Sequence, residues 1–175
     1  MKYSISEQWR IWQKVQWVKP TVAWAAGYLE NGFCPQCQLC CGPQPGDEPF
    51  PMALLPSQIH PDIEQVFYMY DENHASLDAR GCKALGPRGC LEPRENRPPA
   101  CGLFPLVMSS GHLYLYAVCP ASLMIPLGTW FNLGQEAQVW LKQFPLNILQ
   151  HLDITLPDDI TKDRYIDLHL QIWQA

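Results

Sequence analysis

The residues of this 175-residue chain whose types and spacing could do chemistry are its eight cysteines, all between Cys34 and Cys119. The densest group is the run CPQCQLCC at residues 34–41, in which two Cys-x-x-Cys steps share Cys37. Such a step points two sulfurs toward one place. Tetrahedral zinc takes four sulfurs at about 2.3 Å, and a four-iron cluster takes three ligands from a run of this kind plus a remote fourth. The run therefore predicts a metal centre held by thiolates.

The other cysteines follow the run at longer spacing. Cys82, Cys90 and Cys101 each stand next to a glycine, which permits the tight turns that ligand loops need. Cys119 is followed by proline, as remote cluster ligands often are. Eight cysteines are enough for two four-thiolate sites, so one site and two sites both remain open. The complete set of candidate metal ligands is Cys34, Cys37, Cys40, Cys41, Cys82, Cys90, Cys101 and Cys119.

Within this set we rank the ligands by position. Cys34, Cys37 and Cys40 are expected to bind the metal, with a fourth ligand from the second group. Either Cys90 or Cys101 is expected to complete the site, while Cys82 and Cys119 form a second tier. The adjacent pair Cys40 and Cys41 is expected to point its sulfurs in divergent directions. Those two residues would then serve two sites, or one would be a ligand and the other a core thiol.

Basic side chains gather beside the later cysteines. Five of the twelve Lys and Arg residues lie within eighteen positions of one another: Arg80, Lys83, Arg88, Arg94 and Arg97. A solvated basic loop is one interpretation. The other is that one or two of these arginines offset or hydrogen-bond the thiolates, because a zinc ion with four thiolates carries a net charge of −2.

The order of these motifs resembles the YkgJ-like CxxCxxCC cysteine-cluster family. The family pattern is CxxCxxCC, then Cys-x-x-Leu, a further cysteine and RPxxCxxFP. The chain has the run 34–41, then CKAL from Cys82, Cys90, and RPPACGLFP from Arg97, so that the match spans about residues 34–120. The resemblance implies a zinc- or iron-chelating domain, and some members are labelled iron–sulfur oxidoreductases. The chain departs from the pattern at Leu39, where the family often has glycine, and at Gly102, where it often has arginine.

Together the residues and the resemblance predict a metal-binding protein with a redox or accessory role. The cofactor is an iron–sulfur cluster or zinc, and the three-ligand run favours the cluster. The alternative is a structural four-cysteine zinc module that stabilises a protein-interaction surface. The sequence shows no acid–base pair, nucleophile or phosphate-binding loop that would identify an enzyme. The resemblance alone suggests an enzymatic activity, that of an iron–sulfur oxidoreductase.

Composition limits the partners. The net charge is −5, with 17 acidic and 12 basic residues, which argues against general nucleic-acid binding. No apolar stretch is long enough to span a membrane, and the start MKYSISEQWR lacks the apolar core of a signal peptide. The sequence therefore favours a cytoplasmic protein with reduced thiols, a metal ion or cluster as partner, and neither nucleic acid nor membrane. A protein partner is left open.

The elements that must position the cysteines predict an α+β fold. Helical flanks are expected to pack around a loop-rich cysteine centre, residues 34–120, with a small β-hairpin, all in one domain over residues 1–175. The hairpin arms are 103–108 and 112–118, of which the second alternates His and Tyr with apolar residues, and they are expected to bring Cys101 and Cys119 together. A short helix is expected over 61–70.

The flanks show helical periodicity. A first helix is expected from a capping box at Ser4 and Glu7, and a second over residues 21–30. In the last third we expect a helix that breaks at Pro145 and a final helix that begins in the polar stretch 158–163. Their apolar faces are expected to bury a common set of side chains around the centre: Trp9, Trp12, Val15, Trp140, Phe144, Leu168 and Ile172.

Overall fold

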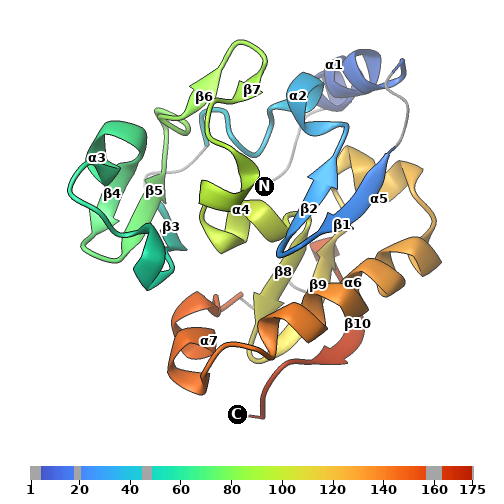
Figure 1. Ribbon diagram of the computed structural model, residues 1–175. Coiled ribbons are helices and arrows are strands. Elements are labelled where there is room, and N and C mark those ends of the chain that lie inside the picture. Colours follow the sequence, from blue (N-terminus) through green and yellow to red (C-terminus); the bar gives the residue numbers. More distant parts are fainter. Residues whose placement is uncertain (1–4, 18–20, 45–48, 157–162, 175) are drawn as a thin grey trace.

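The computed structural model describes residues 5–17, 21–44, 49–156 and 163–174. Short helices and small antiparallel sheets alternate along the chain, so the fold is α+β, as predicted. In Figure 1 the flank helices lie along one side and the ends of the cysteine-rich centre, which holds short strands, turns and one-turn helices.

The helices are short apart from two. The longer ones are α1 (Ile5–Val15) and α6 (Leu127–Leu141). The others are α2 (Cys34–Cys37), α3 (Ile63–Val66), α4 (Pro99–Leu103), α5 (Pro120–Met124) and α7 (Leu146–Leu152), with 3₁₀ turns η1 (Pro56–Gln58) and η2 (Arg94–Asn96). Among the described residues, none of these helices has the length and apolar character needed to cross a membrane.

In the described part of the chain, all strand pairs are antiparallel. Two ribbons are formed by β1 (Val22–Ala25) with β2 (Tyr28–Asn31) and by β6 (Leu85–Gly86) with β7 (Gly89–Cys90). One three-stranded sheet has the order β3 (Phe50–Ala53), β5 (His74–Leu77), β4 (Tyr68–Asp71). The other has the order β10 (Tyr165–Gln171), β9 (His112–Tyr116), β8 (Leu106–Ser109).

The helix predicted over residues 21–30 is wrong, because this segment forms the β1–β2 hairpin. Its turn residues, Ala26 and Gly27, have φ values of 46° and 112°, which a helix interior does not allow. A Cβ at Gly27 would lie 2.7 Å from Nε1 of Trp140, so the turn needs glycine for space as well. Packing on α6 thus overrides the local apolar pattern, which fits a helix and a hairpin equally well.

The final helix is also wrong, because Tyr165–Gln171 is a strand at the edge of the β8–β9 hairpin. Leu168 and Leu170, two residues apart, are both buried, as expected for alternate residues of a strand. The apolar residues that suggested a helix are therefore buried by a strand instead. The register shifts between Asp167 and Leu170, where His169 has a φ of 55° and an exposed side chain. The polar helix start predicted at 158–163 and the capping residue Ser4 lie outside the described residues, except for Asp163.

Two other predicted elements are confirmed. The hairpin β8–β9 turns through Ser110 and Gly111, both with positive φ. The break at Pro145 is present, since α6 ends at Leu141 and Pro145 caps the start of α7. The helix predicted over 61–70 is too long, because α3 lasts for one turn and β4 follows it.

Two hydrophobic cores lie on either side of the cysteines. The first joins both flanks to the β8–β9 hairpin and includes Val15, Trp130 and Leu168, all nearly inaccessible to water. The second lies under the β3–β5–β4 sheet. Cys37 and Cys119 belong to the first core, whereas Cys82, Cys90 and Cys101 pack against the second. The cysteines therefore occupy the region where the two cores meet.

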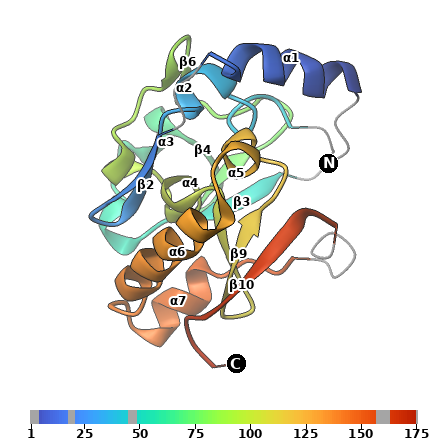
Figure 2. The same cartoon turned by 90° about the vertical axis from the view of Figure 1, so that its right-hand side faces the viewer.

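Most of the flank side chains that were predicted to be buried are buried or partly buried, but two are exposed. Val15, Leu168 and Ile172 are buried, and Trp140 and Phe144 pack partly buried against the first core. Trp9 and Trp12 instead remain 57% and 50% exposed. The reason is the position of α1 at the edge of the molecule, where it packs against α2 and α5 and sends Val15 into the core (Figure 2).

Candidate metal centre

The run 34–41 folds as one helical turn followed by a tight turn. Proline at the start of α2 suits a helix N-terminus, and the N–H of Cys37 donates to the carbonyl of Phe33 at 2.9 Å. Gln38 then takes a left-handed conformation, φ 53°, which ends the helix. Cys34 and Cys37 thus sit at the two ends of a single turn, and Cys40 and Cys41 follow in the next.

Backbone contacts fasten the second cysteine group to this run. The N–H of Cys82 donates to the carbonyl of Cys41 at 2.8 Å, and the side-chain amide of Gln38 donates to the carbonyl of Pro87 at 3.2 Å. Gly81 allows the first contact, since its φ is 81° and an added Cβ would lie 3.0 Å from backbone atoms of residues 42 and 43. The loop that carries Cys82 and Cys90 is therefore held against the run by hydrogen bonds to its backbone and to Gln38.

Two cavities collect the sulfurs. One has a volume of about 910 Å³ and is lined by Cys34, Cys40, Cys41, Cys82, Cys90 and Cys101 among its residues. The other, of about 40 Å³, is lined by Cys34, Cys37, Cys40, Cys41 and Cys119 among others. All eight cysteines are free thiols, and each lines at least one of the two cavities.

The two sulfurs expected to diverge point toward each other instead. Sγ of Cys40 lies 3.9 Å from Sγ of Cys41. Adjacent side chains alternate in an extended strand, but here both residues lie in a turn that the N–H of Gly42 closes onto the carbonyl of Gln38. Four sulfurs at 2.3 Å around a tetrahedral metal are separated from one another by about 3.8 Å. The pair therefore has the spacing of one edge of such a site.

Electrostatics single out Cys41. The hydrogen-bonding contact with the Cys40 sulfur and the positive charge of Arg97 and Arg94 lower the pKa of Cys41 to about 7 despite burial. The pKa of its partner Cys40 is raised, chiefly by that same contact and by burial. Cys41 therefore ionises more readily than the other thiols of this group.

The remaining thiols are held in the neutral form by burial. Desolvation raises the pKa of Cys37 and of Cys82 to about 11, and that of Cys119 to about 12. Burial also raises the pKa of Cys34, Cys90 and Cys101. Because thiolates are the form that binds metal, a metal ion here would displace protons from these groups.

Two of the five basic residues near the cysteines interact with the sulfurs. Arg94 hydrogen-bonds Cys34, and its guanidinium also donates to the carbonyl of Leu29. Arg97 lies near Cys41 and is held by the carbonyl of Glu92 at 2.8 Å. These two side chains therefore offset thiolate charge, as one of the two sequence interpretations held.

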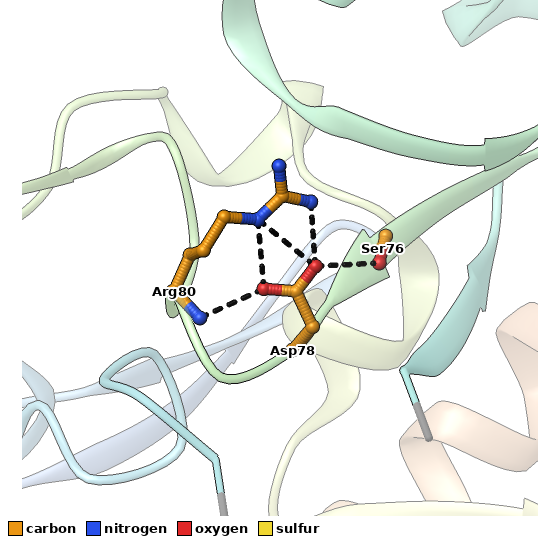
Figure 3. A network of polar contacts seen from close by, with 3 residues as sticks. All are labelled: Ser76, Asp78 and Arg80. Atoms are coloured by element: carbon orange, nitrogen blue, oxygen red, sulfur yellow. Dashed lines mark hydrogen bonds and ion pairs between the residues drawn. The ribbon is translucent and has the colours of Figure 1, made fainter. Parts of the chain in front are cut away.

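The other basic residues have different partners. Arg80 pairs with Asp78 at 2.6 Å, which also contacts Ser76 (Figure 3), and it lies over the ring of Tyr68. Lys83 donates to the carbonyl of Glu64 at 2.6 Å. Arg88 is exposed at the rim of the larger cavity. For Arg80 and Lys83, a surface role away from the sulfurs is the better description.

The hairpin does not bring Cys101 and Cys119 into one cavity, contrary to expectation. Cys101 lies in α4, five residues before β8, and packs against the second core, with its thiol 3.4 Å from Sδ of Met52. Cys119 caps α5 in the first core, where Cys34 and Cys37 are its neighbouring sulfurs. Helix α4 therefore carries Cys101 away from the strand ends.

One polar residue at the site carries no obvious sequence signal. Asn31 is 5% exposed and lines both cavities. Its Oδ1 accepts the N–H of Phe33 at 3.0 Å, which identifies the free atom as the Nδ2 donor, and that donor has no partner among the described residues. In the sequence, Asn31 directly follows the segment 21–30 that is expected to be a helix. None of the five histidines lines either cavity.

The donor chemistry fits a thiolate-bound metal, but the sulfurs are not pre-assembled. In the described part of the chain, no three His, Cys, Asp or Glu side chains are gathered closely enough to hold a metal ion. Cys41 is nevertheless within electrostatic range of most of the set: Cys34, Cys37, Cys40, Cys82, Cys90 and Cys101. The sulfurs would therefore have to come closer together to hold a metal.

Comparison of the chain with protein-family models, with curated proteins and with solved structures finds no match.

Proposed function

We propose that this protein binds a metal centre through cysteine thiolates and uses it in a redox or accessory role. The observation that carries the proposal is the gathering of all eight free cysteines around two cavities that share Cys34, Cys40 and Cys41. Arg94 and Arg97 beside these sulfurs supply the positive charge that a thiolate-bound metal requires. Membership of the YkgJ-like cysteine-cluster family is part of the same proposal.

The ligands come from the run and from one remote loop. Cys34, Cys37 and Cys40 remain the proposed ligands, and Cys41 joins them because its sulfur faces Cys40 and carries charge near pH 7. Cys90 and Cys101 line the same cavity as Cys34, Cys40 and Cys41, which supports either as the remote ligand. Such thiols are kept reduced in the cytoplasm, which we propose as the compartment.

The metal is an iron–sulfur cluster in the primary proposal, because three cysteines spaced two residues apart are typical cluster ligands. When bound, a cluster supplies one-electron redox chemistry. Zinc is the second candidate, and the 3.9 Å separation of the Cys40 and Cys41 sulfurs favours it. In that case the site stabilises an interaction surface and does no redox work.

Anaerobic purification without added metal, followed by elemental analysis and a visible spectrum, tests the proposal. We expect near-stoichiometric metal. Iron with a brown, oxygen-sensitive absorbance would indicate the cluster, and colourless protein with zinc would indicate the second candidate. Protein that contains neither metal and has four disulfides by mass would overturn the proposal.

Substitutions test the ligand ranking. Cys37→Ser is expected to release metal and to lower the free energy of unfolding, because metal binding and folding are linked. Cys119→Ser is the matched control, with the same chemical change in a second-tier thiol. If Cys37→Ser kept full metal and stability while Cys119→Ser lost both, the ranking would be wrong.

A further inference from the structure

Three tryptophans near the start of the chain are exposed to solvent. Trp9 and Trp12 are 57% and 50% exposed, and Trp17 is 86% exposed. The rings of Trp9 and Trp12 stack on one side of α1, with centroids 5.2 Å apart. By contrast, Trp130 is fully buried. Indole rings left in water at this density mark a surface that contacts something else.

The charge of this segment is opposite to that of the rest of the molecule. Residues 1–20 carry four basic side chains and one acidic side chain, a net charge of +3, so the other 155 residues carry −8. Arg10 and Lys14 stand exposed on α1 itself, within one turn of the stacked rings. At about 100° per residue, Arg10 and Lys14 lie on a different side of α1 from the stacked rings, so the helix has an aromatic side and a basic side.

The position of α1 leaves this surface accessible. In both views the helix lies at one end of the molecule, beside α2 (Figures 1 and 2). It also packs against α5, where Leu123 is 75% exposed and Met124 is 40% exposed. The apolar surface thus extends beyond one helix.

We propose that α1 docks this protein onto an anionic lipid surface. Helices with exposed tryptophan and basic residues lie in the interface of a membrane, with the rings at the level of the headgroups and the cations on anionic lipids. The indole fits this region because its ring takes apolar contact while its N–H stays hydrated. A second copy of the chain fits less well, since pairing α1 with α1 would bring Arg10 and Lys14 of both copies together.

Membrane binding by α1 would not require the metal centre. It would, however, determine where the metal centre lies relative to the membrane. Because α1 packs against α2, docking places the cysteine run close to the lipid surface. The protein would associate with the membrane from one side without crossing it.

The test is co-sedimentation of the full-length, metal-loaded protein with phosphatidylcholine vesicles that contain 30% phosphatidylglycerol, alongside vesicles of phosphatidylcholine alone. We expect binding to the anionic vesicles, a blue shift of tryptophan fluorescence, and weakening as salt is raised. Trp9→Gln/Trp12→Gln should lower partitioning at least tenfold. Arg10→Gln/Lys14→Gln should lower it by roughly fivefold for each basic side chain.

The control is Leu146→Gln on α7, which removes an apolar side chain that is 51% exposed elsewhere on the molecule and should not change binding. Because the substituted side chains of α1 are exposed, circular dichroism and metal content should match the parent protein. Equal binding to neutral and anionic vesicles, no binding to either, or a sizing-column dimer that the tryptophan variants abolish would each overturn the proposal. Metal content reports separately on the metal centre, so the two proposals can fail independently.

Discussion

At the level of single residues, Cys41 is the thiol that interacts electrostatically with most of the other cysteines. Its sulfur lies 3.9 Å from that of Cys40 and near two arginines, while the other sulfurs are kept protonated by burial. If these residues hold a metal, its binding would require protons to leave several thiols. We infer that Cys41 is the thiol of the set that loses its proton most readily.

This inference gives a prediction for the metal-free, reduced protein. Cys41 should be alkylated by iodoacetamide faster than the other cysteines, with a midpoint near pH 7, because the pKa is lowered from 9 and the thiolate persists until the pH falls through about 7. Peptide mass spectrometry across pH 5 to 10 measures it.

A pair of substitutions identifies the cause. Arg97→Gln should move the midpoint for Cys41 upward, because one source of positive charge is lost. Arg80→Gln should leave it unchanged, since Arg80 pairs with Asp78. A midpoint near pH 9 in the unsubstituted protein would contradict the role given to Cys41.

The sequence shows which residues form the candidate site but not how they are arranged. Cysteine spacing identifies the run and the basic group, and Arg94 and Arg97 lie beside thiols as one interpretation predicted. The convergence of Cys40 and Cys41 depends on turn geometry that spacing does not specify. Asn31 escapes notice because its burial results from strand pairing in a segment predicted to be helical.

At the level of elements, glycines next to cysteines have different roles. Gly81 has a positive φ and no space for a Cβ against residues 42 and 43, whereas Gly102 lies in α4 with ordinary contact to Tyr28. Both stand beside a cysteine in the sequence. Gly81 allows the close contact between two cysteine-bearing segments, whereas Gly102 takes part in no such contact.

Gly81→Ala is therefore predicted to destabilise the protein by about 1–3 kcal/mol through backbone strain, and to lower metal retention as the Cys82–Cys41 hydrogen bond is disturbed. Gly102→Ala is the matched control and should leave both properties close to those of the parent protein. Urea unfolding and a chelator competition assay measure the two effects. Equal losses from both substitutions would show that Gly81 has no special role.

The periodicity of apolar residues predicted some helices and strands correctly and others wrongly. The wrong predictions share one cause. The longer helices and the β8–β9 hairpin are found where expected because their patterns fit one structure only. Residues 21–30 and 165–171 have apolar residues that fit either period. In both, strand pairing decides the outcome, and for 165–171 the partner strand β9 is about fifty residues away in sequence.

At the level of the whole molecule, the first core links residues from both ends of the chain. Leu168, Leu170 and Ile172 are buried in the same cluster as Val15 and the β8–β9 hairpin. Full burial of one such side chain contributes roughly 1.5–3 kcal/mol. The arrangement agrees with one cooperative unit around the cysteines, and this single-domain hypothesis stays a prediction.

Limited proteolysis tests it on metal-loaded protein. Trypsin can reach Lys142, which is exposed between α6 and α7. We expect the segment after a cut there to remain bound through β10 and to co-elute with the rest on a sizing column. Rapid release of residues 143–175, with metal retained by the remainder, would contradict a single domain.

The central claim is that sulfur from the clustered cysteines binds metal in this protein. X-ray absorption spectroscopy at the iron and zinc edges, on anaerobically purified protein with no added metal, tests it most directly. A first shell of sulfur at about 2.3 Å is the result the account predicts, and it should be lost in Cys37→Ser. A shell of only nitrogen or oxygen, or no metal at either edge, would contradict it.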